Sequence, residues 1–471
     1  MKTGGGGSGG AALAVLLVAA VALLMGGSSH ARRTADVSFI DESVHVAEDG
    51  TTPQHIHIAY GETADTMSIV WSTAEDSSSL VRYGTSAASL DKVVSGQTVL
   101  FTKGNPSGLH YIHRVKLMHL DYGRTYYYLV QSDSARSSVY NFTTMKESSN
   151  WEARLLVFGD MGRHGGPQAL PSLIEEVQKG WPHAIIHAGD FAYDLHSDGG
   201  LTGDEFMEQI QPLAATVPYM TCIGNHEDDF DYSHYINRFY MPNFEDSQNM
   251  WYSWDMGKAH FVAYSTEVFF QPSDKYTPQR QYQWLVKDLT KANLNREERP
   301  WIIVFGHRPM YCSNENHDDC TKYNSTVRNN LESLFYDQGV DLIIEAHEHS
   351  YERLWPVYNE KVIQHNYIRP RAPVHIISGA AGCNEQDGVC VNPIKTPGGP
   401  WSAFRSSGNT TYGYGRMIIY NDTHLYWEEL QAVLDDRVLD SIWVVQDQHG
   451  TSFGSASMKL SPLNELTRLK D

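Results

Sequence analysis

The sequence predicts a layered α/β domain preceded by a small all-β sandwich, and three observations support this fold class. Short β-type runs separated by turn residues fill residues 55–145, with no helix-period segment between them. After Trp151, longer apolar runs alternate with helix-compatible stretches. The chain has 471 residues, more than a single hydrophobic core usually holds. We therefore expect the sandwich over residues 55–148 and the α/β domain, including C-terminal strands, over residues 152–471.

Composition and charge exclude one broad class of function. Apolar residues make up 41% of the chain, as in an ordinary globular protein. Acidic residues outnumber basic ones 56 to 36, which gives a formal net charge of −20. Because nucleic-acid binding needs clustered Lys and Arg to meet the phosphates, this surplus argues against a nucleic-acid partner. The oligomeric state cannot be read from the sequence.

The N-terminus has the features of a cleavable signal peptide over residues 1–31. Lys2 precedes a continuous apolar run over residues 11–25, and the small-residue exit Ser29-His30-Ala31 follows. A helix of this length spans about 22 Å, less than the ~30 Å core of a bilayer, which favours a signal peptide over an uncleaved anchor. No later stretch is long and apolar enough to span a membrane. We expect a secreted chain, or one in the lumen of the secretory pathway.

Sequons and cysteines fit the same compartment. The acceptors for N-glycosylation are Asn141, Asn324, Asn409 and Asn421. Cys312 with Cys320, and Cys383 with Cys390, form two short-range pairs that could each close a small loop under oxidising conditions. The remaining Cys222 lies in an apolar run and is predicted to be a buried thiol. No C-x-x-C unit is present, which argues against a structural zinc cluster.

The sandwich is predicted from the β-type runs in the first part of the chain. They cover residues 56–60, 67–73, 80–84, 111–120, 125–131 and 139–145. Residues 66–71 alternate polar with apolar side chains at period two, as a half-buried strand does. The segment from Leu120 to Tyr128 looks like the corner of a fibronectin type III-like domain, where a tyrosine usually bonds back to the backbone.

In the α/β domain, the apolar runs end in polar side chains. The runs cover residues 154–160, 183–190, 217–225, 301–307, 341–349 and 374–382, and helix-compatible stretches cover residues 167–179, 278–293 and 326–338. All but one run ends on Asp, His or Asn, which are side chains that bind metals. Because ligands of such sheets bind beyond the carboxyl ends of the strands, these ends indicate a site.

The strand ends together carry a ligand set for two metal ions. Its members are Asp160, Asp190, Tyr193, Asn225, His307, His347 and His349. A Gly or Ala before most of them lets the backbone approach closely. Two ions about 3.5–4 Å apart need such a set, with a carboxylate able to bridge them. Carboxylate and phenolate oxygens suit a hard trivalent ion, whereas imidazole with an amide oxygen suits a softer divalent one.

Each motif alone also has a structural interpretation. A Gly-Asp pair can form a turn, Tyr193 can belong to the core, and His347 and His349 can share one face of a strand. In a loop, those two histidines could instead reach both ions. The occurrence of all the motifs, each closing a β run, favours a metal centre over packing.

The series resembles the purple acid phosphatases, a branch of the calcineurin-like metallophosphoesterases, over about residues 55–430. Many metallophosphoesterases outside this branch begin with Asp-x-His, whereas here Met161 and Gly162 follow Asp160. Tyr193, three residues after Asp190, stands where the branch places its iron-binding phenolate. The sandwich in front resembles the two-domain form of the family.

The resemblance implies roles for individual residues. Asp160, Tyr193 and His349 would hold Fe(III), and Asp190 would bridge the ions. Asn225, His307 and His347 would hold the second ion, Fe(II), zinc or manganese. His226 would contact the substrate phosphate. His317 falls where some members have another substrate-contacting histidine, but it is equally well explained as a solvated loop residue.

Two departures from the family pattern remove no ligand. Ala346 replaces the usual Gly before His347, and Arg308 follows His307 where other residues are common.

The implied activity is hydrolysis of small phosphate monoesters below neutral pH, by attack of a hydroxide that the metals generate. A related enzyme acting on diesters or nucleotides would carry the same ligands, since substrate choice lies in loops such as residues 228–258, 308–325 and 384–412. A non-catalytic secreted binding glycoprotein is the alternative from another class. A serine hydrolase is not supported, because no G-x-S-x-G motif is present.

Overall fold

The structure is a computed structural model that describes residues 50–163, 168–271, 273–382, 399–406, 412–432, 435–451 and 453. The predicted signal peptide, Asn409 and the pair Cys383–Cys390 lie outside these residues. The chain divides into one unit over Met1–Val44 and another over His45–Asp471, and the fold below is that of the second unit. Among the described residues, none of the helices combines the length and the apolar composition that a membrane span requires.

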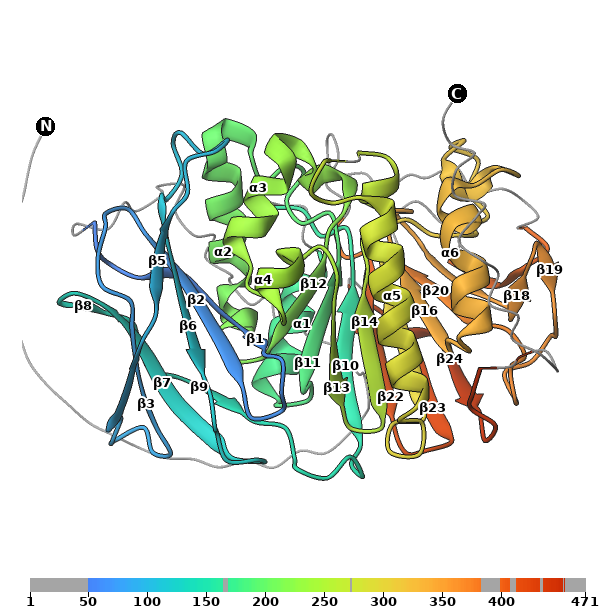
Figure 1. Cartoon of the computed structure of the whole chain (residues 1–471), viewed down its shortest axis with the longest axis horizontal. Coiled ribbons are helices and arrows are strands. Elements are labelled where there is room, and N and C mark those ends of the chain that lie inside the picture. Colours follow the sequence, from blue (N-terminus) through green and yellow to red (C-terminus); the bar gives the residue numbers. More distant parts are fainter. Residues whose placement is uncertain are drawn as a thin grey trace, which may run out of the picture. The chain divides into compact units, whose positions relative to one another are not determined.

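Residues 54–143 form the predicted β-sandwich (Figure 1). One antiparallel sheet has the order β1 (Gln54–Tyr60), β2 (Met67–Thr73), β6 (Tyr111–Leu117) and β5 (Gln97–Leu100). The other has the order β4 (Lys92–Ser95), β3 (Leu80–Gly84), β7 (Thr125–Ser132) and β8 (Ala135–Arg136), and β9 (Tyr140–Thr143) also pairs with β7. At the corner before β7, the Asp121 amide donates to the Tyr126 hydroxyl at 3.0 Å, as the sequence predicts.

Two larger sheets follow in the described part, and the first is built around three parallel strands. Its order is β12 (Tyr219–Cys222), β11 (Ala184–Ala188), β10 (Ala153–Phe158), β22 (Gly413–Ile419), β23 (His424–Gln431) and β24 (Arg437–Val445). Strands β10, β11 and β12 run parallel, and β22 joins β10 in the antiparallel sense. Helices α1 (Leu170–Gln178) and α2 (Leu201–Ala214) pack on it through side chains such as Leu173 and Phe206.

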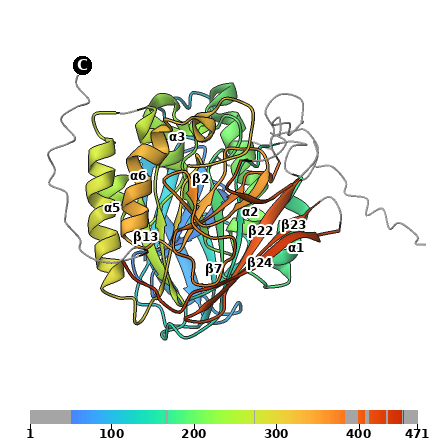
Figure 2. The ribbon, with the colours of Figure 1, turned by 90° about the vertical axis from the view of Figure 1, so that its right-hand side faces the viewer.

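The second large sheet also has a parallel centre. Its order is β13 (Tyr252–Met256), β14 (Ala259–Ala263), β15 (Trp301–Phe305), β16 (Leu342–Glu345), β20 (Val374–Ser378), β17 (Tyr351–Leu354) and β21 (Ser402–Arg405). Helices α5 (Pro278–Asn293) and α6 (Thr326–Asp337) cover its outer face, where Leu289 and Leu331 pack in one core with Val304. Figure 2 shows these helices on one side, and β22–β24 with α1 on the other.

The smaller elements lie between these strands. They are α3 (Asp229–Arg238), α4 (Phe244–Ser247), β18 (Val357–Tyr358), β19 (Lys361–Val362) and the 3₁₀ turns Ser197–Gly200, Asn225–Glu227, Glu267–Phe269 and Asp319–Thr321.

The two large sheets meet where their parallel strands end. The amide of Gly159, just past β10, donates to the Ser378 carbonyl at the end of β20 at 2.8 Å. The Ala381 amide returns a bond of 3.3 Å to the Gly159 carbonyl. The carboxyl ends of both parallel groups therefore face one region, which is where ligands of such sheets bind.

The sandwich is joined to the α/β part of the chain through α2. The Tyr128 hydroxyl donates to the Ala215 carbonyl at 2.6 Å, and the Ile56 amide donates to the Gln211 side chain at 2.6 Å. These buried and part-buried bonds tie the sandwich to the C-terminal end of α2.

Candidate metal centre

Five predicted ligands follow directly on parallel strands. Asp160, Asp190, His307 and His347 each lie two residues past the end of β10, β11, β15 and β16, and Asn225 lies three residues past β12. This regular offset brings side chains that are far apart in the sequence to one edge of the two sheets. Several of these residues also have the left-handed backbone that clusters at functional sites, with φ of 58° at Asp160, 52° at Asp190 and 66° at His347.

Glycines next to the ligands give them room. A Cβ at Gly224 would lie 2.1 Å from Asp190 Oδ1. Gly189 has φ +84°, and a Cβ there would lie 2.6 Å from His307 Nδ1. Both positions therefore require the residue without a side chain, as the Gly-Asp and Gly-Asn motifs suggest.

One group of predicted ligands combines oxygen donors with an imidazole. The Tyr193 hydroxyl lies 3.2 Å from Asp160 Oδ1 and 2.9 Å from His349 Nε2. His349 Nε2 lies 3.4 Å from the same Asp160 oxygen. The structure thus brings together the three residues predicted to hold Fe(III), and their carboxylate and phenol oxygens suit a hard cation.

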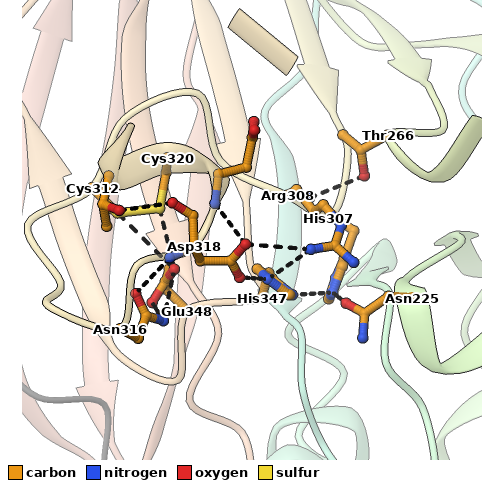
Figure 3. A network of polar contacts seen from close by, with 12 residues as sticks. Asn225, Thr266, His307, Arg308, Cys312, Asn316, Asp318, Cys320, His347 and Glu348 are labelled. Carbon is orange, nitrogen blue, oxygen red and sulfur yellow. Dashed lines mark hydrogen bonds and ion pairs between the residues drawn. A yellow bond between two sulfur atoms is a disulfide. The ribbon is translucent and has the colours of Figure 1, made fainter. Parts of the chain in front are cut away.

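The second group centres on His307. Its Nε2 lies 3.2 Å from Asn225 Oδ1 and 3.1 Å from His347 Nδ1 (Figure 3). It also lies 3.1 Å from Asp190 Oδ2. His307 Nδ1 lies 2.8 Å from the Ala188 carbonyl, an acceptor, so the Nδ1 proton bonds there. In the neutral ring, Nε2 then carries a lone pair that faces the lone pairs of Asp190, Asn225 and His347. A bound cation stabilises such an arrangement because all of these atoms can bind it. The residues present therefore fit a metal ion.

Electrostatics in this group favour positive charge. Burial lowers the pKa of His307, but the Asp190 carboxylate outweighs it and raises the pKa to about 10. Since a proton and a metal ion compete for the same lone pair, a site that attracts the proton so strongly also attracts a cation.

His347 and His349 lie in the loop between β16 and β17. The His347 amide donates to Asp160 Oδ2 at 2.9 Å, which ties this loop to the end of β10. The backbone places the His347 ring against His307 and the His349 ring against Tyr193. The two histidines therefore reach different groups of ligands, as expected if they lie in a loop and not on one face of a strand.

His226 lies beside both groups. Its Nδ1 contacts Asp194 Oδ1, and its Nε2 lies 4.0 Å from Asp190 Oδ2. Its ring meets the Tyr193 ring edge-on at 4.7 Å between centroids. This position fits the predicted contact with a substrate phosphate.

The structure does not bring His317 into the ligand set. His317 is exposed, and its side chain makes no polar contact with any residue that the structure describes. Its role in substrate binding stays a prediction.

Several residues at the site carried no role in the sequence interpretation. The buried Glu227 accepts from the amides of Asp190 and Gly224 at 3.0 Å each, and so fixes two of the turns. Burial and the nearby Asp190 raise the pKa of Glu227. The available signal was its position in the sequence, two residues after the predicted ligand Asn225. Asp318, which contacts His347, follows His317 directly but stands in no strand-end motif.

The predicted cysteine pair, the free cysteine and the glycosylation acceptors are not members of the ligand set. Cys312 and Cys320 form a disulfide, and Cys222 is a buried free thiol, as predicted. Asn141, Asn324 and Asn421 are exposed, and their use as glycosylation sites stays a prediction.

Comparison with known families gives three matches along the chain. Residues 53–144 match the purple acid phosphatase N-terminal domain, and residues 153–351 match the calcineurin-like phosphoesterases. Residues 372–441 match the family described as iron/zinc purple acid phosphatase-like protein C.

Individual proteins agree with these matches. The chain is 44% identical over 422 residues to acid phosphatase type 7 of Danio rerio, covering 85% of this chain and 93% of the relative. It is 43% identical over 412 residues to the Homo sapiens protein of the same name, covering 84% and 92%. A purple acid phosphatase from yellow lupin (Lupinus luteus) seeds has the same fold, with a TM-score of 0.73 at 22% identity over 87% of this chain and 78% of that one. The chain belongs to the purple acid phosphatase family.

Proposed function

We propose that this purple acid phosphatase is a secreted enzyme that hydrolyses small phosphate monoesters best at acidic pH, with Fe(III) and a divalent ion as cofactors. As a member of its family, the chain is a binuclear metal acid phosphatase. The observation that carries the proposal is that Asp190, Asn225 and His347 each place an atom with a lone pair 3.1–3.2 Å from His307 Nε2. The cluster of Asp160, Tyr193 and His349 is the second group of ligands.

The donor chemistry supports the assignment of the metals. Asp160, Tyr193 and His349 would hold Fe(III), and Asp190 would bridge the two ions. Asn225, His307 and His347 would hold Fe(II), zinc or manganese. The first set offers hard oxygen donors, and the second offers mainly imidazole.

The chain's own residues would bind and orient the ester. When bound, the two ions supply positive charge for the phosphoryl oxygens and lower the pKa of a water molecule. His226, whose ring Asp194 orients through Nδ1, would donate a hydrogen bond to a phosphoryl oxygen or hold a proton at the leaving oxygen. The buried Glu227 keeps the turns after β11 and β12 in shape, and so keeps Asp190 and Asn225 in place.

Two features support a place in the secretory pathway. The first residues have the charge and apolar pattern of a signal peptide. The disulfide Cys312–Cys320 is of the kind that persists in oxidising compartments.

A substrate panel with one variant tests the proposal. Activity of the purified protein on p-nitrophenyl phosphate, phosphoenolpyruvate, a nucleoside monophosphate and a phosphodiester is measured between pH 4 and pH 8. We expect hydrolysis of the monoesters with an optimum below neutrality. Asp190→Asn should lower this to the background rate and reduce the metal content, while Asp447→Asn, at an exposed ion pair with Arg369, should change neither. An Asp190→Asn protein with full activity and both metals would overturn the proposal, and preference for the diester would overturn the substrate class.

A further inference from the structure

We propose that Asp318 is a positioning residue that orients the His347 ring toward the divalent ion without binding either the ion or the substrate. The inference rests on the proposed function, because it assumes that His347 is a ligand. It concerns a carboxylate on the loop between β15 and α6 (Figure 3).

The two nitrogens of His347 face different partners. Nδ1 lies 3.1 Å from His307 Nε2, on the side of the ligand set. Nε2 contacts Asp318 Oδ2 on the other side of the ring. A carboxylate only accepts, so this contact places the ring proton on Nε2 and leaves the lone pair on Nδ1. Asp318 therefore selects the tautomer that a metal ligand needs and makes Nδ1 more basic.

Arg308 places positive charge beside the Asp318 carboxylate. Its Nη1 lies 3.6 Å from Asp318 Oδ1. Nη1 also lies 3.1 Å from His347 Nε2, but a guanidinium only donates, and the shorter contact of Nε2 with the Asp318 carboxylate decides where the ring proton lies. The fully buried Glu267 holds the guanidinium through two contacts of 3.0 Å from Nε, and the Phe270 ring lies 4.5 Å below it. Positive charge at this point also disfavours a separate cation on Asp318.

The loop that carries Asp318 is fixed on both sides. The disulfide between Cys312 and Cys320 closes it. Asn316 donates to both carboxylate oxygens of Glu348, at 3.2 and 2.9 Å, between the two ligand histidines. Such a preorganised loop suits a residue that must hold a ring in one orientation.

Asp319, next to Asp318, anchors the loop to helix α6. It accepts from the Thr326 amide at 2.9 Å, the Val327 amide at 3.1 Å and the Ser325 hydroxyl at 2.7 Å. Because Asp319 is buried and bonded to the helix start, the backbone of Asp318 has a defined position.

The test compares Asp318→Asn with wild type and with Glu315→Gln, an exposed acidic residue of the same loop. Each full-length protein is loaded with iron and Zn²⁺. Metal content, the rate of Zn²⁺ loss to a chelator, the visible spectrum and the steady-state constants are then measured. We expect Asp318→Asn to lose Zn²⁺ roughly 10- to 100-fold faster, as is typical when the partner of a ligand histidine is changed. Iron content, the Tyr193–iron band and KM at saturating Zn²⁺ should not change, and Glu315→Gln should behave as wild type.

Each other outcome overturns a defined statement. Equal Zn²⁺ retention by Asp318→Asn and wild type would overturn the role of Asp318 while leaving the proposed function intact. Loss of iron and colour together with Zn²⁺ would mean that Asp318 supports the whole centre, and an increase in KM alone would mean that it contacts substrate. A wild-type protein that binds no metal would overturn the proposed function and this inference with it.

Discussion

His307 and His347 share one pattern, in which one ring nitrogen faces the ligand set and the other has a fixed acceptor. For His307 the acceptor is the Ala188 carbonyl at 2.8 Å, and for His347 it is the Asp318 carboxylate. The histidines themselves could be predicted, because each follows a β run in a recognisable motif. Asp318 could not, since its contact with His347 depends on how a loop folds back over the strand ends.

At His226 we predict a loss of turnover without a loss of metal. His226→Gln should lower kcat roughly 10²- to 10⁴-fold, because the side chain no longer supplies a proton or charge to the reacting phosphate. Metal content and the visible spectrum should match wild type, since the ring lies beside the ligands and Asp194 holds it from the other side. His365→Gln, at an exposed position, is the control. A variant with wild-type kcat would exclude His226 from the reaction.

From the surroundings of His260 on β14, we predict that the free energy of unfolding depends on pH, independently of the metals. Burial lowers the pKa of His260, but contacts of 2.7 Å to Asp255 and 2.9 Å to Asp288 outweigh it and raise the pKa to about 9. A raised pKa adds stability that is fully present below the unfolded pKa of about 6.5 and is lost as the pH rises through about 9.

Urea unfolding across this range measures the effect. Because Asp255 is partly exposed, we expect His260→Gln to reduce the free energy of unfolding by only about 2 kcal/mol at pH 6. The difference from wild type should shrink towards pH 9.5. A difference that stays constant with pH would contradict this electrostatic origin.

At the scale of elements, the helices and strands that could be predicted are those with a clear hydrophobic pattern over a sufficient length. The runs 278–293 and 326–338 became α5 and α6, because each has an apolar face and a capping residue at its start. Helix α2 was not predicted, since Gly203 and Pro212 interrupt its pattern, and it is held by buried residues such as Phe206. Strands β4 and β5 were missed because they are short and largely exposed.

The start of α5 gives a prediction for one element. Thr277 accepts from the Arg280 amide at 3.3 Å, and Pro278 follows at the first helical position. Thr277→Ala should lower the free energy of unfolding by about 1 kcal/mol, while Thr277→Ser should retain most of it. Phosphatase activity should stay at the wild-type value, because α5 covers the outer face of its sheet. Equal stability of the Ala and Ser variants would show that the cap contributes nothing.

At the scale of the whole described unit, the site depends on two sheets that meet at their strand ends. The sequence indicated which runs end in metal-binding residues, and the predicted fold class is confirmed. It did not indicate that the strands divide into two sheets, because that division follows from long-range contacts such as the bond between Gly159 and Ser378. The same long-range packing places His347 against His307 and His349 against Tyr193, although the two histidines are only two residues apart in sequence.

The visible spectrum and metal content of the purified protein, measured beside Tyr193→Phe, test the central claim most directly. The Tyr193 hydroxyl lies against Asp160 and His349, where a phenolate would bind iron. We predict two metal ions per chain and a purple charge-transfer band in the wild type, with the band lost in Tyr193→Phe. A colourless wild type with two metals would contradict the phenolate–iron site, and a wild type without metal would contradict the binuclear centre itself.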